Sequence, residues 1–179
     1  MSRFDCEAII SGAGPVGLCL ALLLARAGVA VEVFEADAAL SEDLRASTFH
    51  PPTLDLLERL GLAQDLVAQG LICPHWQIRL HPSGDHARFD LSVLADATAH
   101  PYRLQVEQWK LSRLLLSALE RERGAKITFG ARVDGLAQDD EGVTVEIESN
   151  GARVARRARF AIGAEDRKST RLNSSHVSE

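Results

Sequence analysis

The sequence predicts an α/β fold in which a parallel sheet starts with a βαβ unit and carries an antiparallel β-meander insertion. Residues 1–35 supply the first observation, because apolar runs, a glycine-rich loop and a helical pattern follow one another there. Residues 131–158 supply the second, because short alternating runs are separated by turn-forming Gly, Asp and Asn. The two patterns together indicate one sheet with parallel and antiparallel parts.

The βαβ unit begins with residues 6–10, a short apolar run that predicts a buried strand. The loop that follows is Gly12-Ala13-Gly14-Pro15-Val16-Gly17, and it opens an apolar helix that we expect to continue through Ala25. Gly28 predicts the end of that helix. Residues 29–34 predict the second strand, with Glu35 at its tip.

This glycine spacing in this context is typical of dinucleotide-binding loops. We expect Gly12 to permit the tight turn, Gly14 to let a pyrophosphate approach the backbone, and Gly17 to allow close contact between helix and strand. The N-terminus of the helix would then face the diphosphate with its free N–H groups and its positive dipole end. Glu35 would accept hydrogen bonds from an adenosine ribose hydroxyl. A purely structural glycine turn is the alternative.

The middle of the chain predicts short helices and a hairpin. After a polar loop at residues 36–43, residues 53–60 predict a helix with Thr53 as its N-cap, Gly61 as its stop, and Leu54, Leu57 and Leu60 buried. Residues 63–68 predict another short helix. Residues 76–81 and 87–91 flank a turn at residues 82–85 and predict a β-hairpin.

The second half of the chain starts with a long helix, predicted over residues 106–123 and closed by Gly124. Its apolar side comprises Trp109, Leu111, Leu114, Leu115, Ala118 and Leu119. Strands are then predicted over residues 126–129, 131–136, 143–148, 154–158 and 160–164.

Composition and charge narrow the function classes. The net charge is −5, and the cluster of Arg153, Arg156, Arg157 and Arg159 is interpreted as the solvated side of strands, so we expect no nucleic-acid partner. The three cysteines lack metal-ligand and CxxC spacing, which predicts no metal and reduced thiols in a cytoplasmic protein. The apolar stretch at residues 16–25 is too short to span a membrane, and no signal peptide is expected.

Three segments together resemble one known family. The first is the glycine loop with its flanking strands. The second is Leu44-Arg45-Ala46 with the helix predicted after it, and the third is Tyr102-Arg103-Leu104-Gln105-Val106-Glu107-Gln108. The resemblance is to the N-terminal FAD-binding part of single-component flavin-dependent monooxygenases, a group that includes aromatic-ring hydroxylases similar to para-hydroxybenzoate hydroxylase. It implies a Rossmann-like FAD-binding domain, here truncated.

The resemblance also implies which residues bind FAD. These are Gly12, Ala13, Gly14, Pro15, Val16, Gly17, Glu35, Ala36, Arg45 and Gln105. Arg45 would pair with the diphosphate or lie near the flavin, since its planar fork suits phosphate oxygens. Gln105 would contact the ribose and pyrophosphate, unless it caps the next helix. His50 is expected to be a loop residue near the cofactor, and no catalytic side chain is identified.

The activity implied by the resemblance is oxygenation of a small aromatic, often phenolic, molecule. In that family NAD(P)H reduces the flavin, dioxygen adds at the flavin C4a position, and the resulting hydroperoxide transfers one oxygen atom to the substrate. The alternatives are a related FAD reductase, oxidase or halogenase, an NAD-binding dehydrogenase, and a non-catalytic nucleotide-binding remnant. Oligomeric state, coenzyme choice and substrate identity are not predicted.

The C-terminal residues depart from the family pattern. Residues 160–164 resemble the strand before the family's Gly-Ala-Asp-Gly motif, but here the chain continues Gly163-Ala164-Glu165-Asp166. Residues 166–176 resemble a translated sequencing adapter, and the family's later Gly-Asp motif is absent. We therefore expect residues 1–164 to be a fragment of the FAD-binding domain, in which residues 72–100 begin a substrate domain. We expect residues 165–179 to be a non-native tail. The parent protein would be an enzyme, and this fragment alone would be inactive.

Overall fold

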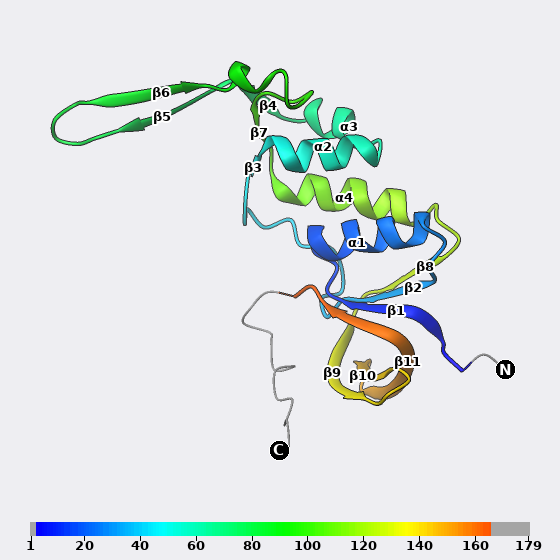
Figure 1. The fold of residues 1–179 in the computed structure, drawn as a ribbon. Coiled ribbons are helices and arrows are strands. Elements are labelled where there is room, and N and C mark those ends of the chain that lie inside the picture. The colour runs from blue at the N-terminus through cyan, green and yellow to red at the C-terminus, as the bar shows by residue number, and fades with distance from the viewer. Residues whose placement is uncertain (1–2, 166–179) are drawn as a thin grey trace. The chain divides into compact units, whose positions relative to one another are not determined.

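The computed structural model describes residues 3–165, which form two compact units (Figure 1). The first unit contains residues 3–42 and 115–165, and the second contains residues 43–114. Of the predicted non-native tail only Glu165 is included, because residues 166–179 lie outside the described residues.

The first unit is built on a six-stranded sheet with the order β8-β2-β1-β11-β10-β9. The strands are β1 (Cys6–Ser11), β2 (Val31–Phe34), β8 (Ala125–Thr128), β9 (Ala131–Gln138), β10 (Val143–Ser149) and β11 (Ala152–Gly163). β8, β2 and β1 pair in parallel, whereas β9, β10 and β11 pair antiparallel. The predicted α/β class, with its βαβ start and antiparallel meander, is confirmed.

β11 corrects one expectation. The strands predicted over residues 154–158 and 160–164 are a single strand whose N-terminal half pairs antiparallel with β10 and whose C-terminal half pairs parallel with β1. Ala158 belongs to both pairings, as partner of Val143 and of Cys6. The exposed Arg159 suggested a break in the apolar pattern, but a strand can place a polar side chain on its solvent face without interruption.

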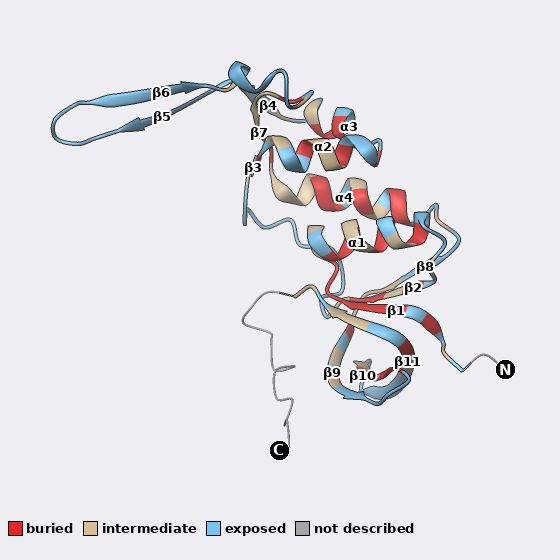
Figure 2. Ribbon diagram, in the orientation of Figure 1, coloured by how far each residue is buried: buried red, intermediate tan, exposed pale blue. Residues whose placement is uncertain are grey.

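Helix α1 (Pro15–Arg26) covers one face of the parallel strands and buries Leu18, Ala21 and Leu22 completely. The strand side of this core is formed by Ile10, Val31 and Val33, none of which exceeds 1% exposure. Ile9 points to the opposite face, where it belongs to a buried cluster with Phe34 and residues of β9, β10 and β11. Figure 2 shows buried residues along both β1 and α1. β1 is therefore a central strand covered on both sides, as its uninterrupted apolar run predicts.

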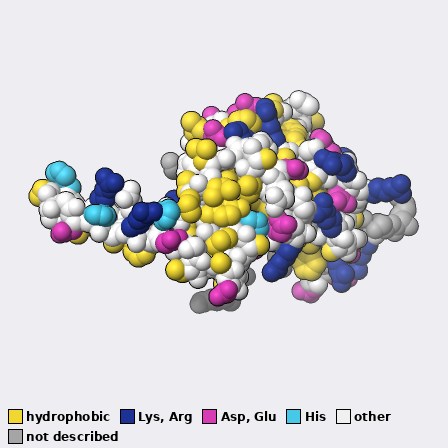
Figure 3. Space-filling view, turned by 90° about the horizontal axis from the view of Figure 1, so that it is seen from above, with side chains coloured by type: hydrophobic (Ala, Val, Ile, Leu, Met, Phe, Trp, Pro, Cys, Tyr) yellow, Lys and Arg dark blue, Asp and Glu magenta, His cyan; other side chains and the backbone are white. Residues whose placement is uncertain are grey.

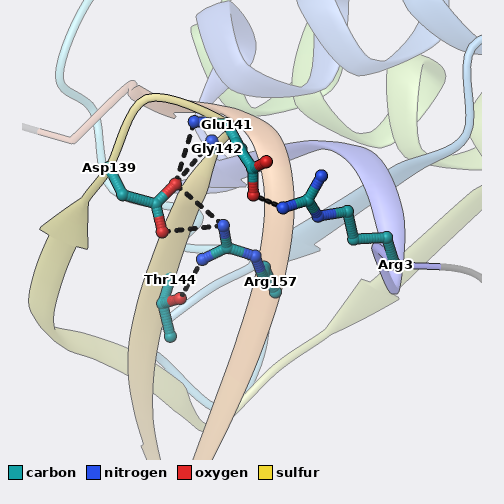
Figure 4. Close-up of polar contacts among 6 residues, drawn as sticks. All are labelled: Arg3, Asp139, Glu141, Gly142, Thr144 and Arg157. Carbon is teal, nitrogen blue, oxygen red and sulfur yellow. Dashed lines mark hydrogen bonds and ion pairs between the residues drawn. The ribbon is translucent and has the colours of Figure 1, made fainter.

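The meander is secured by a polar network at the turn between β9 and β10 (Figure 4). Both carboxylate oxygens of Asp139 accept hydrogen bonds from Arg157 Nη2 at 2.8 Å. Asp139 Oδ1 also accepts the backbone N–H groups of Glu141 and Gly142, and the Arg157 guanidinium lowers the pKa of this carboxyl group. The predicted solvated arginine cluster is thus largely paired with acids, since Arg153 contacts Asp134 in the same way at 3.0 Å.

The second unit contains a small antiparallel sheet that the sequence did not predict. Its order is β3 (Thr48–Phe49), β7 (Arg103–Gln105) and β4 (Leu71–Cys73). Strands of two or three residues are too short to produce an alternating pattern, so only tertiary pairing identifies them. The predicted hairpin is present as β5 (His75–Arg79) and β6 (His86–Asp90), followed by the 3-10 helix η1 (Leu91–Leu94).

Two helix starts differ from expectation. α2 (Pro51–Arg59) begins before Thr53, with His50 at the N-cap position, because prolines suit the first helical positions and displace the start toward the N-terminus. α4 (Gln108–Leu119) begins after Val106, whose backbone N–H donates to Ser47 O instead of extending the helix. Helix α3 (Ala63–Val67) is close to its predicted range.

The interior of the second unit largely follows the helical spacing. Leu54, Leu57 and Leu60 of the helix predicted over residues 53–60 are buried. Leu111 of the helix predicted over residues 106–123 is buried too. Trp109 differs from its expected core position, because it is only half-buried and the Arg113 guanidinium lies 4.7 Å from the centre of its ring.

Two structural features are absent from the described residues. Within residues 3–165 no helix is both long and apolar enough to cross a membrane. The same residues contain no group of three or more His, Cys, Asp or Glu side chains placed to hold a metal ion.

Candidate functional site

The glycine loop between β1 and α1 is shaped by two close approaches. Gly12 has a φ of +104°, and a Cβ atom there would lie 2.9 Å from the carbonyl oxygen of Ala164. A Cβ atom on Gly17 would lie 2.0 Å from the carbonyl oxygen of Gly12. Side chains are therefore excluded from both positions by the protein's own packing. This matches the tight turn and the close helix contact expected from the sequence.

Gly14 differs from its two neighbours in the motif. It is the N-cap of α1 in an extended conformation, and a Cβ atom built there would meet no atom of residues 3–165 within 4 Å. No side chain caps this end of the helix, and its first turn carries no acidic residue. The positive end of the α1 dipole is therefore left uncovered by the described residues. An anion can reach the backbone N–H groups there. Protein packing does not explain a glycine here.

Glu35 lies directly beside the loop. One carboxylate oxygen accepts the backbone N–H of Ala13 at 2.7 Å, and the other accepts the N–H of Asp37 at 2.9 Å. The tip of β2 and the glycine loop are thus joined by one acid, with the exposed Ala36 next to it. A carboxylate here can accept hydroxyl hydrogens from a ribose at the same edge of the sheet.

Sequence reasoning assigned no role to Ser11, which lies beside the end of β11 at this site. The Ala164 N–H donates to Ser11 O at 2.8 Å, and the Ser11 hydroxyl donates to the Glu165 carboxylate. Residues 164–165 therefore lie against the glycine loop although they are far from it in sequence. The resemblance of residues 160–164 to the strand before the family's Gly-Ala-Asp-Gly motif indicates that this segment is relevant, but its position beside the loop depends on the β1–β11 pairing.

Arg45 and Gln105 belong to the second unit, whereas residues 12–17, Glu35 and Ala36 are brought together in the first. Arg45 is exposed and forms an ion pair with Asp43 at 3.7 Å. Gln105 uses both ends of its amide, donating to Ser47 Oγ at 2.7 Å and accepting from Thr48 Oγ1 at 3.0 Å. Gln105 lies in β7, so it does not cap the helix that follows.

The second unit contains a pocket of about 810 Å³. Its lining residues are His50, Pro51, Pro52, Asp55, Trp76, Leu91, Leu94, Ala97, Thr98 and Arg103. His50, expected to lie in a loop near a cofactor, is therefore a pocket residue at the start of α2. Sequence reasoning assigned no role to Asp55, Trp76 or Arg103.

A buried histidine supports one wall of this pocket. His100 is 3% exposed, and its Nδ1 lies 2.9 Å from Asp55 Oδ1. The Thr98 hydroxyl donates to the same oxygen at 2.6 Å. These two hydrogen bonds stabilise the ionised carboxylate, so the pKa of Asp55 is lowered.

None of the three cysteines is disulfide-bonded. Burial raises the pKa of Cys6 to about 11 and also raises the pKa of Cys19. Both thiols are therefore protonated near neutral pH, which argues against a cysteine nucleophile at these positions.

Comparisons with known proteins point in one direction. A family model described as "FAD binding domain" matches residues 5–177. Para-nitrophenol 4-monooxygenase of Pseudomonas sp. (strain WBC-3) is 37% identical over 163 residues, which cover 90% of this chain and 40% of that protein. The 6-hydroxy-3-succinoylpyridine 3-monooxygenase of Pseudomonas putida (strain DSM 28022 / S16) is 36% identical, over 88% of this chain and 40% of that protein.

Solved structures agree. The crystal structure of p-nitrophenol 4-monooxygenase from Pseudomonas putida DLL-E4 superposes with a TM-score of 0.85 at 33% identity, over 92% of this chain and 42% of that one. Aklavinone-11 hydroxylase, in a ternary complex with FAD and aklavinone, gives 0.76 at 29% identity, over 90% and 33%. The chain thus spans about two fifths of the length of the curated relatives that it matches.

Proposed function

This chain belongs to the FAD-binding-domain family, and we propose on that basis that it is the cofactor-binding part of a flavin-dependent monooxygenase that hydroxylates an aromatic or phenolic substrate. The observation that carries the proposal is the open space at Gly14, bounded by the uncapped start of α1 and by Glu35. A diphosphate bound there would accept hydrogen bonds from backbone N–H groups.

The proposed FAD ligands divide by the part of the cofactor they would hold. Residues 12–17 would bind the diphosphate, and Glu35 with the neighbouring Ala36 would bind the adenosine ribose. Arg45 would exchange its exposed partner Asp43 for a phosphate, a contact that suits its planar fork. Gln105, oriented by Ser47 and Thr48, would present its amide to the ribose and diphosphate edge.

Bound flavin would supply the redox chemistry, taking a hydride from NAD(P)H and activating dioxygen so that one oxygen atom enters the ring and the other leaves as water. The residues of this chain bind and orient the cofactor. The substrate would be a small aromatic molecule, as the names of the relatives indicate for those proteins. A cytoplasmic location, no nucleic-acid partner, and a non-native origin of residues 165–179 remain parts of the proposal.

A FAD reductase, oxidase or halogenase is the alternative that the glycine loop and Glu35 serve equally well. A nucleotide-binding remnant without catalysis is the second alternative for the chain by itself, since it spans about 40% of its curated relatives. An NAD-binding dehydrogenase would require the glycine loop and Glu35 but neither Arg45 nor Gln105.

Titration of the 179-residue chain with FAD and with NAD, followed by calorimetry, tests the proposal. We expect FAD to bind more tightly than NAD. Gly14→Val should abolish FAD binding, because a branched side chain would fill the space in front of α1, while thermal stability changes little because no protein atom is displaced. Gly124→Ala is the matched control, since its Cβ would make only an ordinary 3.5 Å contact with Val29 O. Unchanged FAD affinity in Gly14→Val would overturn the assignment.

A further inference from the structure

We propose that the pocket of the second unit binds the aromatic substrate as a singly charged anion, and that Arg103 recognises its charged oxygen atoms. The proposal rests on the monooxygenase function proposed above. It adds the charge of the substrate and the residue that binds the charged group.

The shape and lining of the pocket fit a small ring. About 810 Å³ lies within the range of small-molecule sites, and the walls include Pro51, Pro52, Leu91, Leu94 and Ala97. Hydrophobic side chains gather beside the base of the β5–β6 hairpin, with histidine side chains next to them (Figure 3). An apolar ring buried here would lose water contact on both faces, which is favourable.

Trp76 adds a flat aromatic wall. It lies in β5, its ring centroid is 4.8 Å from that of Phe89 in β6, and it remains 41% exposed. The hairpin partner thus holds the indole while leaving part of it open to the pocket. A substrate ring can stack on that surface.

Arg103 is the cation of the pocket, and it lacks a counter-ion among the described residues. Its Nε atom is buried without a hydrogen-bond partner in that part of the chain. A buried donor without an acceptor is costly, and the cost is greater for a charged group. An anionic ligand would neutralise the guanidinium charge by accepting hydrogen bonds from its N–H groups, often at two points.

The sheet fixes where Arg103 points. Arg103 lies in β7, the central strand of its sheet, where it pairs with Cys73 of β4. The next residue of β7 is the fully buried Leu104. Because side chains alternate along a strand, Arg103 and the proposed FAD ligand Gln105 share the face opposite Leu104, about 7 Å apart along the strand. The anion site therefore neighbours the side chain that we assign to the cofactor, as a substrate site should.

Asp55 limits the charge that the pocket tolerates. Its carboxylate lines the pocket but is already engaged by Thr98 and His100, which disperse its negative charge. One anionic group held by Arg103 is compatible with this wall. A polyanion such as phosphate would bring its further charges against Asp55 and would lack an apolar part for the remaining walls.

The test compares benzoate, benzamide and inorganic phosphate as probes of the full 179-residue chain by calorimetry. We expect saturable benzoate binding, at least about tenfold weaker binding of the equally sized but neutral benzamide, and none of phosphate. Arg103→Met should weaken benzoate at least about tenfold, and Arg103→Lys should restore part of the loss. Arg88→Met removes an exposed arginine of β6 that does not line the pocket and should leave benzoate affinity unchanged.

Equal affinity for benzoate and benzamide would overturn the proposal, and so would benzoate affinity that survives Arg103→Met. The comparison of the two probes needs no variant, so it decides even if Arg103→Met fails to fold. FAD titration of the same samples separates the two proposals. FAD binding without benzoate binding overturns only the anion site, whereas benzoate binding without FAD binding overturns the flavin function and leaves an aromatic-anion site.

Discussion

Single residues of the glycine loop act for different physical reasons. Gly12 and Gly17 are required by the fold, because a Cβ atom at either would meet backbone atoms at 2.9 Å or less. Gly14 meets no such limit within the described part of the chain, which fits the diphosphate-binding role that we propose for it. The glycines of this motif therefore divide into two positions that packing requires and one that we propose serves binding.

Gly17→Ala tests that division. The added methyl group would lie 2.0 Å from Gly12 O, so the loop or the helix must shift, and we expect the free energy of unfolding to fall by about 1–3 kcal/mol. Urea denaturation of Gly17→Ala and Gly14→Ala measures the difference. A Gly17→Ala protein as stable as the parent would show that the loop relaxes easily and would contradict the packing argument.

Glu35 has a structural role in addition to the ribose-binding role that we propose for it. In Glu35→Ala the N–H groups of Ala13 and Asp37 lose their acceptor, and we expect about 1 kcal/mol of lost stability. Its FAD affinity should also fall about tenfold, since the ribose loses its acceptor. Denaturation and FAD titration separate the two roles. Lowered stability with intact FAD affinity would mean that Glu35 only joins β2 to the loop.

At the scale of elements, α2 and the segment before β7 are joined by the Asp55 hydrogen bonds to Thr98 and His100. Because these bonds lower the pKa of Asp55 in the folded state, they stabilise the fold above the unfolded pKa of about 3.9. That stabilisation is lost as the pH falls through the lower, folded pKa.

Asp55→Asn should remove this pH dependence. We expect the parent protein to lose stability more steeply than the variant below about pH 4, while the variant is less stable at neutral pH. Melting temperatures of both proteins across the acid range provide the comparison. Parallel acid limbs for the two proteins would show that other carboxylates account for the decline.

The elements also differ in how well sequence patterns predict them. α1 and the strands around it carry long apolar runs and terminal glycines, so their ranges agree within two residues. β3, β4 and β7 have two or three residues each and were missed. β11 was divided in two because Arg159 interrupts its apolar pattern, whereas the structure has one strand that pairs first with β10 and then with β1. Strand identity in these cases comes from pairing rather than from the segment itself.

At the scale of the whole molecule, the reactivity of the Cys6 thiol measures how often the first unit unfolds. It lies in β1 between β2 and β11, is 6% exposed, and its thiol has a pKa of about 11. We expect iodoacetamide near neutral pH to label Cys6 last of the three cysteines, and only when the sheet unfolds. Peptide mapping with and without denaturant measures the order. Early labelling of Cys6 would indicate that β1 opens locally.

The sequence by itself determined the βαβ start, the glycine loop, Glu35 and the family, because these depend on local backbone requirements and on residues close together in the chain. Only the tertiary structure decided that Ala164 and Glu165 lie against the loop, since the β1–β11 pairing joins the two ends of the first unit. It also decided that Arg103 lines an apolar pocket without a counter-ion among the described residues. No sequence pattern identifies the role of a charged residue within a three-residue strand, because that role depends on the side chains that surround it in the folded protein.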